Sequence, residues 1–311
     1  MFEKILVPLD GSELAEVALP YAEELMRRLD SELVLICVSE SSEKPERRNY
    51  LDIIAEEIRQ RAKKYQEKHP GKVVARPIPE TIVIGGNPSD EIVDYAEENQ
   101  INLTIMATHG RSGFGRWAMG SVADKVARGL SKPVCLIRAK GCHAEVRPDC
   151  LVSRIFTPLD GSKTGEAALP YVEVLAKEMG TEVLLFQTVP KDDRNEDVNW
   201  GELRHQADRD AKIYLRKVEA NLIYKGVVAT TEVAFGDKPA QQIIELAERT
   251  QSAVVAMSTH GRSGVDRFVF GSVAEKVLRA GTVPLLLVRA PGSETPRDEN
   301  DGAHCNVKLN N

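Results

Sequence analysis

The stretch ATHGRSGFGRWAMGSVADKV, which begins at Ala107, has the residue types and spacing of a site for an anion. Three glycines follow the apolar run LTIMA, and Gly120 comes directly before SVADKV, which has the pattern of a helix. Glycines let a loop backbone approach a ligand, and the free amides and dipole of a helix N-terminus attract phosphate. Ser121 is then expected to cap the helix, either alone or with its hydroxyl also on a phosphate oxygen.

Familiar phosphate motifs do not describe this stretch. The residues from Gly115 to Ser121 have the spacing of a Walker A motif, but Ser121 stands at the position of the lysine, which excludes an ordinary P-loop. A dinucleotide pattern GxGxxA fits Gly113, Gly115 and Ala118, yet Asp266 replaces the second glycine in a later copy of the stretch. No SGGxDS loop, as in adenylating ATP pyrophosphatases, follows the first predicted strand.

The chain contains the same motifs twice, about 150 residues apart. VPLDGSELAEVALPYAEEL from Val7 recurs as TPLDGSKTGEAALPYVEVL from Thr157, and the glycine stretch returns as STHGRSGVDRFVFGSVAEKV from Ser258. Between them, IGGNPSDEIVDYAEE from Ile84 matches FGDKPAQQIIELAER from Phe235. A repeat of this length is the size of a domain and too long for a solenoid unit, so we predict the duplication of a whole domain.

Within each copy, short apolar runs alternate with amphipathic segments. In the first copy the apolar runs predict strands at 4–9, 31–38, 80–85, 102–107 and 133–138. The amphipathic spacing predicts helices at 12–29, 46–69, 88–100 and 121–130. This alternation implies an α/β fold of two tandem, open-twisted, five-stranded parallel-sheet domains of Rossmann-like type. Pro20 and Pro170 are expected to kink the first helix of each copy.

The expected organisation is a domain at 1–140, a linker at 141–151, a second domain at 152–291 and a polar tail at 292–311. The tail is rich in polar residues and shows no periodicity, which predicts disorder. The linker carries Cys142, His143 and Cys150, which are one ligand short of a zinc site, so we expect neither a metal nor a disulfide there.

The composition narrows the function. The 311 residues are 42% apolar and 28% charged, as in a folded globular protein, and the net charge of −6 argues against nucleic acid as a partner. The first residues, MFEKILVPLD, enter a strand without a leader, and no stretch has 18 unbroken apolar residues, so we expect no membrane partner and a cytoplasmic location.

One pattern survives in both copies: a small residue, two residues, a glycine, nine residues and then Gly-Ser. It comprises Ala107, Gly110, Gly120 and Ser121, and again Ser258, Gly261, Gly271 and Ser272. With PLDGS near the start of each copy and PVCLIR or PLLLVR at its end, the chain resembles the universal stress protein family in its tandem two-domain form. The resemblance covers about 280 residues. It implies the fold of adenine nucleotide α hydrolase-like proteins.

The resemblance implies binding of an adenine nucleotide, ATP or alternatively ADP or AMP, with Mg²⁺ as a possible companion. Residues near the first strand of each copy would contact the base or the sugar: Pro8, Leu9, Asp10, Val38, Pro158, Leu159 and Asp160. Residues of the glycine stretch would surround the phosphates: Ala107, His109, Gly110, Arg111, Gly113, Gly120, Ser121, Val122, Ser258, His260, Gly261, Arg262, Gly264, Gly271, Ser272 and Val273. The family has glycine where Ala107 and Ser258 stand, so a larger side chain at these two positions either fits beside the nucleotide or crowds it.

Several residues have a second interpretation. Asp10 either binds ligand or makes a turn with Gly11 and caps the next helix. Arg111 and Arg262 either neutralise phosphate or are solvated. The histidines that precede these arginines have no triad partner at a suitable spacing, so we expect structural roles and no catalytic residue.

Three functional hypotheses follow. We favour a nucleotide-binding regulatory protein of the stress response, with at most slow ATP hydrolysis. The alternatives are an ATP-hydrolysing or adenylyl-transferring enzyme and a dimerising scaffold without nucleotide. The terminal strands PVCLIR and PLLLVR are expected at sheet edges, where they would join two chains as a homodimer or the two copies as a pseudo-dimer within one chain.

Overall fold

The computed structural model describes residues 1–39, 44–70, 78–108, 119–138, 151–191, 200–250, 254–261 and 270–290. We call residues 1–138 the first half and residues 151–290 the second half. The first half holds β1 (Lys4–Pro8), α1 (Glu13–Glu16), α2 (Leu19–Leu29), β2 (Glu32–Ser39), α3 (Lys44–Lys68), β3 (Glu80–Gly85), α4 (Pro88–Glu98), β4 (Leu103–Ala107), α5 (Ser121–Gly129) and β5 (Val134–Ile137). The second half holds β6 (Arg154–Pro158), a 3₁₀ turn η1 (Gly165–Ala168), α6 (Leu169–Met179), β7 (Glu182–Val189), α7 (Trp200–Tyr224), β8 (Ala229–Phe235), α8 (Pro239–Arg249), β9 (Val254–Ser258), α9 (Ser272–Ala280) and β10 (Leu285–Val288).

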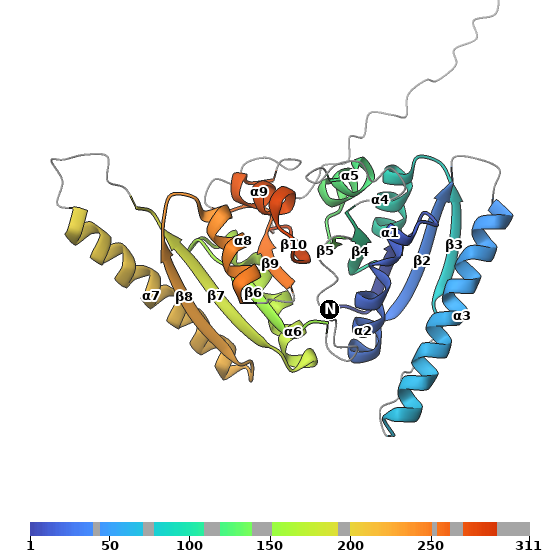
Figure 1. Ribbon diagram of the computed structural model, residues 1–311, viewed down its shortest axis with the longest axis horizontal. Helices are drawn as coiled ribbons and strands as arrows, with labels where there is room; N and C mark the ends of the chain where they lie inside the picture. Colours follow the sequence, from blue (N-terminus) through green and yellow to red (C-terminus); the bar gives the residue numbers. More distant parts are fainter. Residues whose placement is uncertain are drawn as a thin grey trace, which may run out of the picture.

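All ten of these strands form one sheet in the order β3-β2-β1-β4-β5-β10-β9-β6-β7-β8. Within each half the neighbouring strands are parallel, with five strands to each half, as the repeat predicts. The two halves meet where β5 pairs antiparallel with β10, with Cys135 opposite Leu286. Figure 1 shows the two halves side by side, with β5 and β10 between them.

The core forms a layer on each face of this sheet. On one face, apolar side chains of α2, α3, α6 and α7 pack on the strands. On the other face the packing comes from α4, α5, α8 and α9. Strands covered on both sides explain the near-continuous apolar runs in the sequence, such as the fully buried β4 and β9. In Figure 1, α3 and α7 lie at the two outer ends, and α5 and α9 lie near the middle.

The first predicted helix differs from the expectation, because it is interrupted rather than kinked. In the first half α1 ends at Glu16 and α2 begins at Leu19, with Pro20 in the first turn of α2. In the second half the short piece is the 3₁₀ turn η1, and Pro170 lies in the first turn of α6. Proline is tolerated in the first turn because its missing N–H has no intrahelical partner there.

The terminal strands lie in the interior of the sheet, and the edges are β3 and β8. Of the two expected pairings of PVCLIR and PLLLVR, the structure therefore contains the one within the chain. Further contacts cross the junction: Arg128 donates to Glu275 over 2.8 Å, and Arg28 donates to the Met179 carbonyl over 3.1 Å. Each terminal strand has a single hydrogen-bonding partner on either side, so neither edge of β5 or β10 is left for a second chain.

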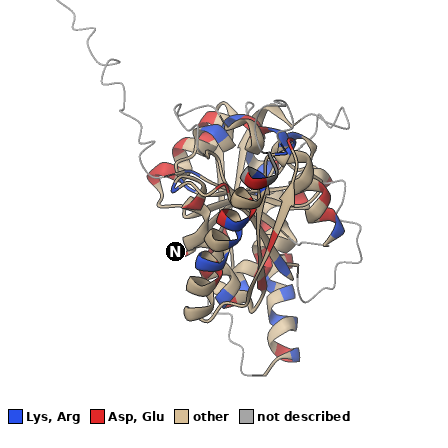
Figure 2. Ribbon diagram, turned by 90° about the vertical axis from the view of Figure 1, so that its left-hand side faces the viewer, with Lys and Arg blue, Asp and Glu red and all other residues tan. Residues whose placement is uncertain are grey.

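The charges of the molecule are mixed. In Figure 2 the basic and acidic residues alternate along the helices rather than gathering by sign. Among the described residues, no helix is both long enough and apolar enough to cross a membrane.

Candidate functional site

Strand order places the two predicted motifs of each half next to each other. In the order 3-2-1-4-5 the connections leave β1 and β4 in opposite directions, and ligands of open parallel sheets bind at such a switch point. The equivalent pair in the second half is β6 and β9, joined at Ile155–Val254 and Phe156–Val255. Asp160 follows β6 and Ser258 ends β9, so both lie at the carboxyl ends of adjacent strands.

Asp160 and Asp10 make the same tight turn. Oδ1 of Asp160 accepts hydrogen bonds from the backbone N–H of Ser162 at 3.0 Å and from its hydroxyl at 2.6 Å, and Asp10 accepts the same bonds from Ser12. Gly161 has a φ of 82°, a left-handed conformation that favours glycine. The turn that was the alternative interpretation of Asp10 is therefore present in both halves. It uses Oδ1 and orients the carboxylate at the strand end.

Two glycines leave room for the Asp160 carboxylate: Gly261 in the loop after β9 and Gly165 in η1. A Cβ added at Gly261 would lie 2.3 Å from Oδ2, and one added at Gly165 would lie 2.3 Å from Oδ1. No side chain larger than hydrogen fits at either position without moving the carboxylate. The first half has Ala15 where the second half has Gly165. This close approach of the carboxylate to η1 is therefore particular to the second half.

The ends of the glycine stretch are tied together by the backbone. Gly271 donates to the Thr259 carbonyl over 2.9 Å, and Gly120 donates to the Thr108 carbonyl over 2.8 Å. Gly271 and Gly120 are the N-caps of α9 and α5. The prediction that the following serines cap these helices is wrong, because the serines are the first helical residues.

A glycine N-cap has a direct consequence for anion binding. It contributes no side chain to the helix end, and no side-chain capping hydrogen bond forms at Gly271 or Gly120. The first amides of an α-helix have no intrahelical acceptor. The N-termini of α5 and α9 therefore keep the donors and the positive dipole end that attract phosphate.

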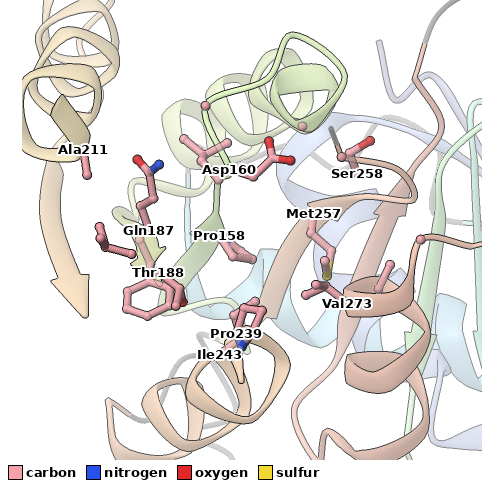
Figure 3. Close-up of a pocket in the computed structure, with 18 of the residues that line it drawn as sticks. Pro158, Asp160, Gln187, Thr188, Ala211, Pro239, Ile243, Met257, Ser258 and Val273 are labelled. Atoms are coloured by element: carbon pink, nitrogen blue, oxygen red, sulfur yellow. The ribbon is translucent and has the colours of Figure 1, made fainter. Parts of the chain in front are cut away.

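A cavity of about 620 Å³ opens at this end of the second half. Its wall combines the strand ends with α7, α8 and the start of α9 (Figure 3). Of the predicted residues, it contains Pro158, Leu159, Asp160, Ser258, His260, Gly261, Gly271, Ser272 and Val273. The structure thus brings together every described site residue predicted for the second half.

Ser258 and His260 line the cavity and are held by local hydrogen bonds. The Ser258 side chain is buried, and its hydroxyl accepts a hydrogen bond from the His260 backbone N–H at 3.3 Å. Nδ1 of His260 lies 2.9 Å from the Thr259 hydroxyl. The serine that replaces the family's glycine is thereby held in the turn. In the first half its counterpart Ala107 is likewise buried.

The sequence prediction missed the wall formed by the end of β7 and by α7. Gln187 and Thr188 line the cavity there, together with Ala211 and Tyr214 of α7. The repeat contains a signal for the first two, since β7 has Gln187 and Thr188 near its end where β2 has Cys37 and Val38. Val38 was predicted as a wall residue, and the same alignment leads directly to Thr188.

The equivalent region of the first half is filled differently. Tyr50 of α3 and Tyr214 of α7 occupy matching places, because each donates to a glutamate, Glu16 and Glu166, over 2.9 Å. Three residues earlier in each helix stand Arg47 and Ala211. Arg47 donates to the Asp10 carbonyl over 3.2 Å. A guanidinium therefore lies at the strand end in the first half, where the second half has a methyl group.

The other described site residues predicted for the first half lie at or near the ends of β1 and β2 and at the start of α5. Pro8 and Leu9 precede the Asp10 turn, Val38 lies near the end of β2, and Val122 is in the first turn of α5. Six predicted site residues lie outside the described residues: His109, Gly110, Arg111, Gly113, Arg262 and Gly264. The linker residues Cys142, His143 and Cys150 also lie outside them. In the described part of the chain, no group of three His, Cys, Asp or Glu side chains is placed to hold a metal ion.

Comparison with known proteins decides the family. The sequence model described as the universal stress protein family matches residues 1–138 and again residues 152–289. The chain belongs to the universal stress protein family. The two matches make it a tandem member, as the repeat and the shared motifs predict.

Single-domain universal stress proteins align with about half of the chain. Universal stress protein MJ0531 of Methanocaldococcus jannaschii is 31% identical over 147 residues, which are 46% of this chain and 86% of that protein. Universal stress protein YxiE of Bacillus subtilis is 29% identical over 150 residues, 44% of this chain and all of that protein.

Solved structures resemble the whole chain. A universal stress protein from Archaeoglobus fulgidus has a TM-score of 0.61 at 21% identity, over 93% of this chain and 99% of the other. Protein PA1789 from Pseudomonas aeruginosa PAO1 has a TM-score of 0.67 at 14% identity, over 93% of each. At these identities the likeness concerns the fold, which is that of a universal stress protein with two tandem α/β halves.

Proposed function

We propose that this universal stress protein binds an adenine nucleotide, with ATP as the preferred ligand, and acts as a regulatory protein rather than as a dedicated enzyme. The observation that carries the proposal is the cavity of about 620 Å³ in the second half, into which the Asp160 turn and the N-terminus of α9 both open. A cavity of this size suits a small-molecule ligand.

The polarity of the cavity matches the two ends of a nucleotide. At one end, Gly271 and the exposed Ser272 begin α9, whose free amides and dipole suit phosphate. At the other end, apolar groups such as Pro158, Leu159 and Ala211 suit the faces of a base. We assign the phosphates to the α9 end and the base to the β7 end, with Mg²⁺ as a companion of the phosphates. The repeat extends the assignment to α5 and β2 in the first half.

Direct titration of the full chain tests the proposal. We expect ATP to bind in isothermal titration calorimetry and to stabilise the fold by about 2.7 kcal/mol at a ligand concentration of 100 times Kd. Absence of binding and of thermal stabilisation at millimolar ATP with Mg²⁺ would overturn it and leave the scaffold hypothesis. Rapid release of ADP or of an adenylylated product would favour the enzyme hypothesis instead.

Two matched substitutions assign the sites. Ser272→Glu places a carboxylate at the start of α9, where it suits the helix dipole and therefore preserves the fold but repels phosphate. Ser121→Glu makes the same change at the start of α5. We expect Ser272→Glu to lose the binding of the second half, and Ser121→Glu to lose only the weaker binding of the first half, where Arg47 lies at the strand end. A stoichiometry and affinity unaffected by both variants would contradict the phosphate assignment.

The proposed regulatory role is supported by the sequence, and three further predictions stand beside it. The absence of a second-substrate motif in the sequence favours regulation over group transfer. A domain division at 140 and 152, a cytoplasmic location and any pairing of two chains stay predictions.

A further inference from the structure

The end of β7 carries a buried amide whose oxygen has no partner in the described part of the fold. Gln187 is 8% exposed, and its Oε1 has no hydrogen-bond partner among the described residues. A buried acceptor without a partner destabilises the folded state, so native proteins pair nearly all such groups. The amide also lines the cavity. Its oxygen is therefore placed to accept a hydrogen bond from a ligand in the cavity.

The side chain lies on the α7 side of the sheet. Residues Val183 and Leu185 of β7 face α6 and α7, and strand alternation puts Gln187 on the same side. Figure 3 shows its amide between Ala211 and Asp160, whereas Pro239 and Ile243 lie beyond the other face of the strand. Since Ala211 is small, the helix leaves room for a ligand next to the amide.

The spacing of strands separates this amide from the phosphate end. β6 lies between β9 and β7, so the end of β7 is two strand spacings, about 10 Å, from the end of β9. The α9 N-terminus follows β9. In a nucleotide the base and the phosphates are attached to opposite ends of the sugar, so a ligand with phosphate at α9 brings its base toward β7.

A carboxamide suits adenine because it carries a donor and an acceptor side by side. Glutamine and asparagine pair with adenine in this way, accepting from the 6-amino group and donating to a ring nitrogen. Oε1 of Gln187 is the unpartnered atom, and it is the one that would accept from the 6-amino group. We propose that Gln187 recognises the 6-amino edge of adenine in the second half, an inference that rests on the proposed nucleotide function.

The first half has no such group. Pro8 pairs with Ile36 and Pro158 pairs with Phe186, so the strand registers place Cys37 and Gln187 at equivalent positions. Cys37 is a buried thiol, a weak hydrogen-bonding group. The two halves consequently differ in base recognition, and selectivity for the 6-amino group belongs to the second half.

The test removes the proposed hydrogen bond from each side in turn. Affinities of the full chain are measured for ATP and for purine riboside 5′-triphosphate, which has hydrogen in place of the 6-amino group. The wild type is expected to prefer ATP by roughly 3- to 10-fold through this bond. In Gln187→Leu, which removes the amide without adding a polar group, the preference should fall by about threefold or more, with any first-half binding unchanged.

The control is Gln242→Leu, at a second glutamine whose Oε1 is buried without a partner but which does not line the cavity. It should keep the preference of the wild type. Gln187→Met replaces Gln187→Leu if the latter fails to fold.

The possible outcomes separate the two proposals. If ATP binds but its preference falls by less than threefold in the Gln187 variant, Gln187 does not recognise the amino group, and nucleotide binding stands. If neither triphosphate binds the wild type, both proposals fail together.

Discussion

At the scale of single residues, the contact between Gly261 and Asp160 links the fold to the site. The Asp160 carboxylate is held by the Ser162 turn on one side and approaches the Gly261 backbone on the other. The glycine is thus needed for the space that it leaves, since it has no unusual φ. This explains in physical terms why the pattern has a glycine three residues after Ser258, the last residue of β9.

Gly261→Ala should destabilise the protein by about 1–3 kcal/mol, because the new methyl would lie 2.3 Å from Oδ2 of Asp160 and must displace it. Denaturant unfolding measures the cost. In an Asp160→Ala background the methyl meets no carboxylate, so most of the cost should disappear. Gly236→Ala is the control, because its methyl meets the flexible amide of Gln242. Equal costs of Gly261→Ala in both backgrounds would rule out this contact as the cause.

The Tyr50 hydroxyl should make the stability of the folded state depend on pH in alkaline solution. Burial, followed by the hydrogen bond and charge of Glu16, raises the pKa of the Tyr50 hydroxyl above its ordinary value. The folded state then holds a proton that the unfolded chain releases above about pH 10, so the stability from this hydroxyl is full below pH 10 and declines as the pH rises.

Tyr50→Phe should cost about 1 kcal/mol at pH 7, and this cost should shrink above pH 10, because the variant lacks the titrating group. Unfolding free energies at pH 7 to 11 measure the difference. Tyr224→Phe, at a side chain in a residue that is 90% exposed, should change neither quantity. A cost that is constant over this range would contradict the raised pKa.

At the scale of elements, α3 and α7 decide how open each strand end is. Their tyrosines make the same bond to a glutamate, but Arg47 reaches the Asp10 carbonyl where Ala211 lines the cavity. The helices are repeats of one element, and one substitution between them changes the space available to a ligand.

Ala211→Arg should therefore close the second-half cavity and weaken ATP binding by at least tenfold, about 1.4 kcal/mol, since the guanidinium would take the place that Arg47 takes in the first half. Ile213→Arg adds the same charge to α7 at a residue that is 67% exposed and does not line the cavity, and should bind ATP as the wild type does. Calorimetric titration of both variants measures the effect. Equal affinities would show that the cavity beside Ala211 is not used.

At the scale of the whole molecule, the sheet is continuous because β5 and β10 pair with each other. Polar contacts reinforce this junction. Arg128 contacts the other half twice: it donates to Glu275 over 2.8 Å, and its guanidinium carbon lies 4.5 Å from the centre of the Phe270 ring. Burial lowers the pKa of Arg138 and of Arg289, which donate across the junction to the carbonyls of Leu278 and Arg128.

Arg128→Ala should lower the free energy of unfolding by about 1–2 kcal/mol, since it removes an interhalf ion pair, a cation–π contact and the ion pair with Asp124 of its own half on a side chain that is 22% exposed. Arg279→Ala is the matched control: Arg279 contacts the same Glu275 over 2.6 Å but within one half, and its side chain is 58% exposed. It should cost less than about 0.5 kcal/mol in the same denaturant titration. Similar costs for both would contradict a stabilising role of the junction contact.

From the amino-acid sequence alone, the duplication, the α/β class and most element positions could be predicted. Two strands illustrate how closely: ETIVIG was expected at 80–85 and is β3 (Glu80–Gly85), and NLTIMA differs from β4 by one residue. Such features depend on local periodicity and on comparison of the chain with itself, both of which are contained in the residue order. The second-half site could also be outlined, because its motif residues follow strands that a parallel sheet brings to one edge.

The three-dimensional arrangement decided the rest. Pairing of β5 with β10, the space beside Ala211 and the unpartnered amide of Gln187 depend on which surfaces meet, and no local pattern encodes distances between segments far apart in the chain. The capping role predicted for Ser121 and Ser272 was wrong for the same reason: whether a serine caps a helix or begins it depends on the path of the preceding backbone, which the contact of Gly120 with Thr108 sets.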